Sequence, residues 1–134
     1  MNGLELLEQN PESAKLICSY YLEKMLESLN DNSLPEDFKD HIRNQGIDNG
    51  KIGSIIESNP RNLFDFFDSH GMYINVTTFP DTLLFTYSIM TEIATSGTSK
   101  VYKTRKEADR NVVETAIKQL ELTLTKSVID KENS

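Results

Sequence analysis

Residues 72–94, MYINVTTFPDTLLFTYSIMTEIA, decide the fold, because their apolar side chains alternate along the chain instead of recurring every three or four positions. Such alternation places the apolar side chains on one face of an extended strand. The stretches 72–79 and 83–94 both alternate, and Pro80-Asp81 between them is typical of a turn. The residues that share the apolar face are Met72, Ile74 and Val76 in the first stretch and Leu83, Phe85, Tyr87, Ile89 and Ile93 in the second. We therefore predict an antiparallel hairpin with one apolar face.

A short third strand and a long helix are predicted after the hairpin. Residues 95–98, TSGT, are typical of a turn, and 100–103, KVYK, predict the third strand. Thr104 and Glu107 fit a capping box at the start of a helix over about 105–124. The apolar residues that this helix is expected to bury are Ala108, Val112, Val113, Ala116, Ile117, Leu120 and Leu124.

The chain before the hairpin predicts helices. An apolar and acidic lead-in, residues 1–8, precedes a helix over about 11–30, and a shorter helix follows over about 34–45. A third helix follows Asp48, and a fourth begins at Asn59-Pro60, carries the densest aromatic cluster of the chain and ends at a glycine. The residues expected to cap these helices are Asn10, Ser33 together with Glu36, Asp48 and Asn59.

These elements predict an α+β protein, in which N-terminal helices are followed by an α-β-β-β-α arrangement with a three-stranded antiparallel sheet. The apolar face of such a sheet needs cover, which only the flanking helices can give. We expect an N-terminal helical region at 1–58, an α-β-β-β-α domain at 59–126 and a polar, frayed tail at 127–134.

The charge of the chain is unevenly distributed, although the total is −7. Residues 1–70 contain six Lys and Arg against thirteen Asp and Glu, whereas residues 71–134 contain eight of each. Five cations nevertheless fall within eleven residues and form what we call the basic patch: Lys100, Lys103, Arg105, Lys106 and Arg110. Only Glu107 and Asp109 oppose them within the same stretch. An acidic front half repels phosphate backbones, so nucleic-acid binding is disfavoured by the overall charge.

Cysteine usage and hydropathy predict a cytoplasmic protein. The single cysteine, Cys18, can form no internal disulfide and has the apolar helical neighbours of a small buried residue. No run of apolar residues is long enough to span a bilayer, and the N-terminus lacks the basic start of a signal peptide. We therefore expect no membrane association.

No pattern in the sequence predicts a metal site, a cofactor or catalytic residues. His41 and His70 are 29 positions apart, and neither has a second ligand at metal-binding spacing. Asp48-Asn49-Gly50 resembles the middle of a calcium loop, but Ile56 occupies the position of the required terminal carboxylate. The nucleophile and phosphate-binding motifs of common enzymes are absent from the sequence, so we expect no enzymatic activity.

The basic patch is the one feature of the sequence that indicates a possible binding site. It spans a strand end and the first turn of a helix, where backbone N–H groups and the helix dipole already favour an anion, so a phosphate could dock there. The alternative is that these cations form only the solvated face of an amphipathic helix.

The second half of the chain resembles a double-stranded-RNA-binding domain. The order α-β-β-β-α, the Asn59-Pro60 start followed by Leu63, and the stretch 104–108, TRKEA, resemble that family. The resemblance implies RNA contacts from the first helix, from the loop between the first two strands and from lysines that open the last helix. Only the last is partly kept, because Arg105 and Lys106 match two of these lysines whereas the third position is Asp109.

The whole chain is also similar to small uncharacterised proteins of Bacteroidetes and their phages, on its M-N-G-L-E start, its N-P-R-x-L-F-D stretch and its Y-K-T-R-K-E-A helix. We expect a non-enzymatic binding or adaptor protein that acts on another protein. The alternative is double-stranded-RNA binding through the basic start of the C-terminal helix.

Overall fold

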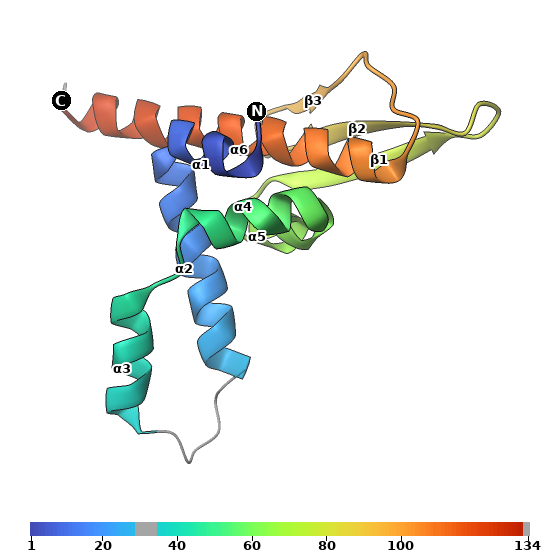
Figure 1. The fold of residues 1–134 in the computed structure, drawn as a ribbon. Helices are drawn as coiled ribbons and strands as arrows, with labels where there is room; N and C mark the ends of the chain where they lie inside the picture. Colours follow the sequence, from blue (N-terminus) through green and yellow to red (C-terminus); the bar gives the residue numbers. More distant parts are fainter. Residues whose placement is uncertain (29–34, 133–134) are drawn as a thin grey trace.

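A computed structural model describes residues 1–28 and 35–132, with side chains as far as residue 126. Its elements, in chain order, are α1 (Gly3–Gln9), α2 (Pro11–Ser28), α3 (Glu36–Gln45), α4 (Asn49–Ser58), the 3-10 helix η1 (Pro60–Leu63), α5 (Phe64–Ser69), β1 (Tyr73–Phe79), β2 (Leu84–Met90), β3 (Thr95–Gly97) and α6 (Arg105–Glu132). Four helices precede η1, α5 and a three-stranded antiparallel sheet, and α6 follows it (Figure 1). The predicted α+β class is therefore confirmed.

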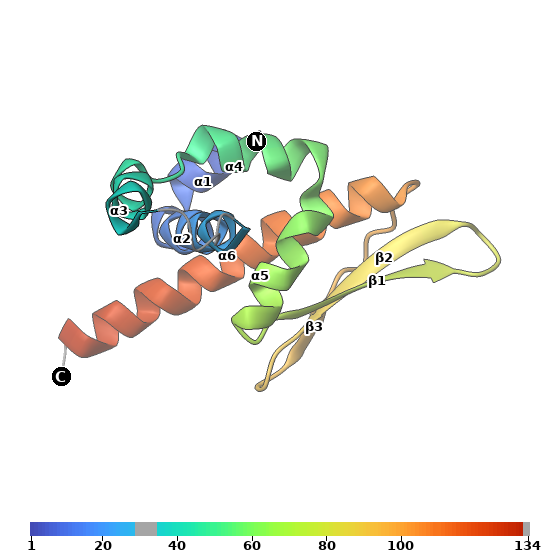
Figure 2. The same cartoon turned by 90° about the horizontal axis from the view of Figure 1, so that it is seen from below.

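The sheet has the order β1-β2-β3, and α5 and α6 lie on the same side of it (Figure 2). Ile74 pairs with Ile89 and Val76 with Tyr87, so the predicted apolar face is confirmed in the middle of the hairpin. It is wrong at two positions, where the side chains of Leu83 and Ile93 are 75% and 97% exposed. Both lie in turns outside the strands, and Leu83 has a φ of 56°.

The third strand was expected at 100–103, but β3 lies earlier, at Thr95–Gly97. The chain reverses sooner because Thr91 closes a turn with Ala94. The N–H and the hydroxyl of Thr91 both donate to the Ala94 carbonyl, and the hydroxyl also accepts a hydrogen bond from the Ala94 N–H. Residues 100–103 run beside β2 and contribute a single bridge, between Tyr102 and Phe85. The segment predicted to be a strand is therefore an irregular edge of the sheet.

The expected lead-in, residues 1–8, is instead part of helix α1, which Asn2 caps by accepting a hydrogen bond from the Glu5 N–H at 2.8 Å. Leu6 and Leu7 are fully buried. The helix packs against α4 so closely that a Cβ added to Gly3 would clash with the Gly53 carbonyl oxygen. The stretch is too short for a helical periodicity to be recognised in the sequence.

The N-terminus of α2 is joined to α6 by hydrogen bonds. The Glu121 carboxylate accepts from the Glu12 N–H at 3.1 Å and from the Ser13 N–H at 2.8 Å. The buried Ser13 hydroxyl donates to the Ile117 carbonyl. Asn10, expected to cap α2, instead donates its side-chain amide to the Leu6 carbonyl. A carboxylate from the other end of the chain thus takes the role of the predicted N-cap.

The predicted ends of the other helices are confirmed only in part. Asp48 caps α4 by accepting from the Lys51 N–H, as predicted. Pro35 rather than Ser33 precedes α3, and Ser33 lies outside the described residues. The backbone of α6 continues to Glu132, beyond the predicted end at residue 124.

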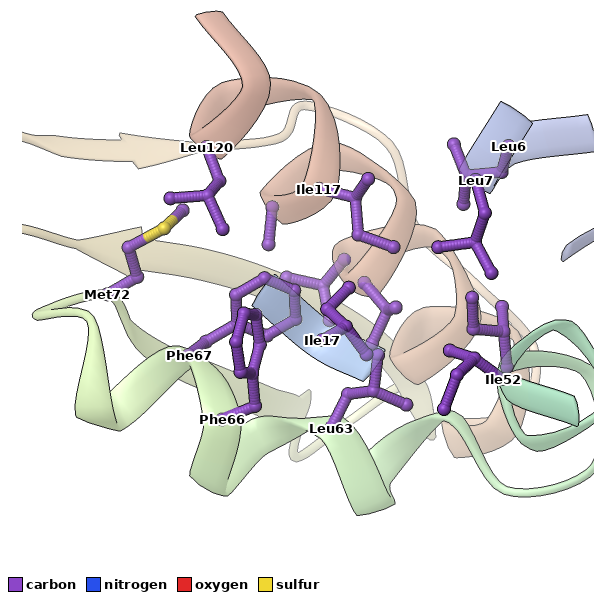
Figure 3. Packing of buried hydrophobic residues seen from close by; sticks show 14 of the residues in the cluster. Leu6, Leu7, Ile17, Ile52, Leu63, Phe66, Phe67, Met72, Ile117 and Leu120 are labelled. Atoms are coloured by element: carbon purple, nitrogen blue, oxygen red, sulfur yellow. The ribbon is translucent and has the colours of Figure 1, made fainter. Parts of the chain in front are cut away.

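One core joins the N-terminal helices to the α-β-β-β-α part. Figure 3 places Leu7 of α1, Ile17 of α2 and Ile52 of α4 around the same cluster as Phe66 of α5 and Ile117 of α6. All the apolar residues predicted to be buried on α6 are buried, except Leu124, which is half-buried. The regions 1–58 and 59–126 therefore share a single hydrophobic core.

The α1–α4 contact makes a direct stability prediction. Gly53→Ala would place a Cβ 2.8 Å from the Leu4 backbone nitrogen, and we expect it to lower the free energy of unfolding by about 2 kcal/mol, measured by urea denaturation. Gly50→Ala, in the same helix, is the matched control, because its Cβ meets only the end of the Asp48 side chain. Equal stability of the two variants would contradict the close contact.

Candidate binding surface

The residues of the basic patch come from two elements. Lys100 and Lys103 belong to the irregular segment beside β2, and Arg105 and Lys106 are the first two residues of α6. Thr104 caps this helix, since its hydroxyl accepts a hydrogen bond from the Glu107 N–H at 3.1 Å, which is one of the two bonds of the predicted capping box. The patch therefore lies where a strand-like segment turns into the long helix.

Arg110 differs from the other four cations of the patch. Its guanidinium contacts the Glu57 carboxylate at 3.1 Å and the Glu114 carboxylate at 3.4 Å, and it donates to the Met1 carbonyl at 2.9 Å. Only 18% of its side chain is exposed. The structure therefore places Arg110 in a joint between α6, α4 and the N-terminus, apart from the surface that the sequence assigned to it.

The remaining four cations, which we call the basic corner, are Lys100, Lys103, Arg105 and Lys106. All four are exposed, and within the described residues no carboxylate oxygen lies within 4.0 Å of their nitrogen atoms. Arg105 lies over the Phe85 ring, 5.3 Å from its centroid, which holds this guanidinium near β2. Lys51 and Lys126 also lack an ion pair in the described part, but both lie on other parts of the chain.

Asp109, one of the two carboxylates that oppose the basic patch in the sequence, is buried. Its carboxylate is 5% exposed and accepts two hydrogen bonds from the Arg61 guanidinium, both at 3.0 Å. Arg61 also lies over the Phe64 ring, 4.9 Å from its centroid. No pattern around Arg61 in the sequence pointed to Asp109, because the two residues are 48 positions apart.

Along the part of α6 whose side chains are described, positive charge does not continue from the basic corner. Lys118 is paired with Glu114 at 3.6 Å, and Glu114 also contacts Arg110. Lys126 is twenty residues beyond Lys106 on the same helix, a separation of about 30 Å at the helical rise. The unpaired cations at the start of α6 therefore form an isolated group.

The face of the sheet turned away from α5 and α6, which we call the outer face, is open. Its members alternate with the inward residues along β1 and β2: Tyr73, Asn75, Thr77, Phe79, Leu84, Thr86, Ser88 and Met90. The side chains of Tyr73, Phe79 and Met90 are 46%, 45% and 47% exposed. Val101, between two lysines of the basic corner, is exposed to the same degree. One exposed apolar side chain, that of Val101, thus lies within the corner.

Two tyrosines hold the segment of the basic corner against the sheet. The ring of Tyr102 stacks on that of Tyr87 with centroids 6.1 Å apart, and the Tyr87 hydroxyl lies 3.0 Å from that of Thr115 on α6. Burial raises the pKa of the Tyr102 phenol, and neighbouring Tyr87 raises it further. Tyr102 is therefore a neutral packing residue at physiological pH.

The two histidines lie in different surroundings. His41 is exposed on α3, a helix without buried residues that projects with the end of α2 from the rest of the protein (Figure 1). The ring of His70 packs on Phe66 with centroids 4.7 Å apart and borders a hollow of about 590 Å³ together with Glu92. Over residues 1–28 and 35–126, no group of three or more His, Cys, Asp or Glu side chains is placed to hold a metal ion.

Comparisons with known proteins return no relative. No family model matches the chain, and neither a curated protein nor a solved structure matches it. None of the helices in the described part has both the length and the apolar character needed to cross a membrane.

The ion pair between Arg61 and Asp109 is expected to stabilise the fold, and its removal gives the first prediction for this surface. Asp109→Asn leaves the guanidinium without its carboxylate, and we expect a loss of about 2 kcal/mol in the free energy of unfolding, because Arg61 is half exposed. Asp68→Asn, an exposed carboxylate on α5, is the control and should cost less than about 0.5 kcal/mol. Urea denaturation of a double-mutant cycle with Arg61→Gln measures the coupling, and additive effects would contradict the pairing.

The reactivity of Cys18 gives the second prediction. Burial raises the pKa of its thiol, the charge of Asp48 raises it further, and the thiol contacts the Asn49 side-chain oxygen at 3.6 Å. We expect iodoacetamide at pH 8 to alkylate the folded protein several-fold more slowly than the urea-unfolded chain, because less thiolate is present. Asp48→Asn keeps a capping side chain and should increase the rate in the folded state. A folded rate equal to the unfolded one would be inconsistent with this surrounding.

Proposed function

We propose that this chain is a non-enzymatic binding protein that recognises an acidic stretch of another protein at the basic corner. The observation that carries the proposal is the isolation of four exposed cations that have no ion-pair partner among the described residues, on a chain whose total charge is −7. A short acidic segment of a partner matches a group of this size. A nucleic-acid duplex is instead bound through contacts that continue along its backbone.

The surroundings of the basic corner support a protein partner. Val101, within the corner, is about half exposed. Protein interfaces combine a buried apolar centre with a polar rim. An exposed valine would add little to phosphate binding, whereas it provides contact area for a protein whose acidic side chains meet the lysines.

Double-stranded-RNA binding is the second candidate, and one observation favours it. The carboxylate of Asp109 is buried against Arg61 and does not face the basic corner, so it does not repel a phosphate there as the sequence suggested. Arg105 and Lys106, at the start of α6, are also the two residues that match the lysines of the RNA-binding family. Four phosphate contacts would then be available.

Charge reversal at the basic corner tests the first proposal. Lys100→Glu/Lys106→Glu removes two cations from the corner, and Lys51→Glu/Lys126→Glu makes the same change in net charge on exposed lysines elsewhere. We expect the wild type and the control variant, but not the corner variant, to retain a protein partner in nuclease-treated pull-downs. All three should keep the same circular dichroism spectrum and melting temperature. Equal capture by both variants would remove the basis for the proposal.

Titration against a duplex RNA of about 20 base pairs tests the second candidate. Four phosphate contacts predict that affinity falls about a hundredfold between 50 and 200 mM salt. The corner variant should lose this binding and the matched control should retain it. Absence of binding at 50 mM salt would exclude the RNA hypothesis and leave the protein-binding proposal unaffected.

A further inference from the structure

Strand β1 forms one edge of the sheet, and the direction of its free backbone groups can be assigned. Phe85 and Tyr102 exchange two hydrogen bonds of 2.8 Å, so the N–H and C=O of Phe85 point away from β1. These directions alternate along an antiparallel ladder. The residues of β1 that bond to β2 are then Tyr73, Asn75, Thr77 and Phe79. The N–H and C=O groups of Ile74, Val76 and Thr78 point out of the sheet, and among the described residues no backbone group bonds to them.

This edge lacks the features by which proteins prevent strand pairing. Exposed edges are commonly protected by lysine, by proline or by a very short strand. The sequence of β1, YINVTTF, contains no charged residue, no proline and no glycine over seven residues. The opposite edge, β3, is only three residues long. The β1–β2 hairpin also projects past the start of α6, which leaves the outer half of β1 clear of the helices (Figures 1 and 2).

The sequence of β1 can pair with the β1 strand of a second copy. If two copies pair antiparallel about a two-fold axis at Val76, all seven residues are matched. Ile74 then lies opposite Thr78, and Asn75 opposite Thr77. On the outer face, Tyr73 of each copy lies opposite Phe79 of the other, and these two aromatic side chains are 46% and 45% exposed in the single chain. Cross-strand aromatic pairs are among the stabilising contacts of antiparallel sheets.

We propose that β1 pairs with β1 of a second copy of this chain, so that the two sheets join into one sheet of six strands. The free N–H and C=O groups of Ile74, Val76 and Thr78 complete the ladder between the copies. Because each copy has a single β1 edge, the two-fold contact closes and does not extend to a fibre. This contact is independent of the partner that binds the basic corner, which lies on the other side of β2.

Charge favours a second copy over other strands at this edge. β1 carries no charged side chain, and residues 71–134 have no net charge, so two copies meet there without repulsion between their strands. The excess of carboxylates lies in residues 1–70. A strongly acidic or basic peptide would find no complementary charge along β1. A neutral strand with aromatic residues at both ends fits, and β1 is such a strand.

Light scattering and sedimentation equilibrium over a range of concentrations test the pairing. The wild type should approach twice the 15.2 kDa of one chain. Tyr73→Lys should raise the dissociation constant about tenfold or more, because it removes both aromatic pairs. Met90→Lys is the matched control, since Met90 lies opposite Tyr73 on β2 with the same exposure, one strand away from the edge, and should leave the dimer intact. Thermal melting verifies that each variant is folded.

Disulfide formation tests the register itself. In a Cys18→Ser background, Asn75→Cys and Thr77→Cys place their thiols opposite each other only across the two-fold, at a non-hydrogen-bonded pair of about 4.5 Å between Cα atoms. A mixture of the two variants should form the mixed disulfide faster than either variant links to itself. A monomer at every concentration, equal effects of Tyr73→Lys and Met90→Lys, or no preference for the mixed disulfide would overturn the proposal.

Discussion

The contact between Arg61 and Asp109 fastens together the two helical segments that flank the sheet in the α-β-β-β-α part. It joins η1, which leads into α5, to the first turns of α6, and these helices cover the sheet. Because Asp109 is almost fully buried, its charge requires a fixed partner, and the planar guanidinium supplies two parallel hydrogen bonds. The contact also removes one carboxylate from the surface beside the basic corner and neutralises the half-exposed Arg61. A single pair therefore contributes both to the packing of α6 and to the charge that remains at its start.

The surface charge of this protein is set by which ions are already paired. Five cations fall close together in the sequence, but Arg110 is held by Glu57 and Glu114, and the continuation along α6 stops where Lys118 meets Glu114. A count of charges along the chain cannot separate paired from unpaired ions, because partners such as Glu57 come from distant elements. These ion pairs leave the basic corner, at the start of α6, as a compact group of cations without a carboxylate partner among the described residues.

Sequence patterns predicted the parts of the fold in which local signals agree. The central hairpin, the cap of α4 by Asp48 and the buried stripe of α6 follow from periodicity and capping. The patterns failed for elements that depend on contacts between residues far apart in the sequence. The N-terminal helix depends on backbone packing at Gly53, and the start of α2 depends on Glu121. The third strand was misplaced because a turn closed by a threonine side chain leaves no pattern in a single sequence.

The N-terminal helices shape the surface of the other half as well as sharing its core. Glu57 of α4 and the Met1 carbonyl both contact Arg110, and no residue of the α-β-β-β-α part replaces these two partners. Residues 59–126 alone would retain Glu114 as the only carboxylate beside Arg110, and would expose a larger positive surface at the first turns of α6. The acidic front half therefore pairs one of the five cations of the basic patch, Arg110. The two regions therefore form one structural unit, joined by a shared core and by the contacts of Arg110, and not a domain with an appendage.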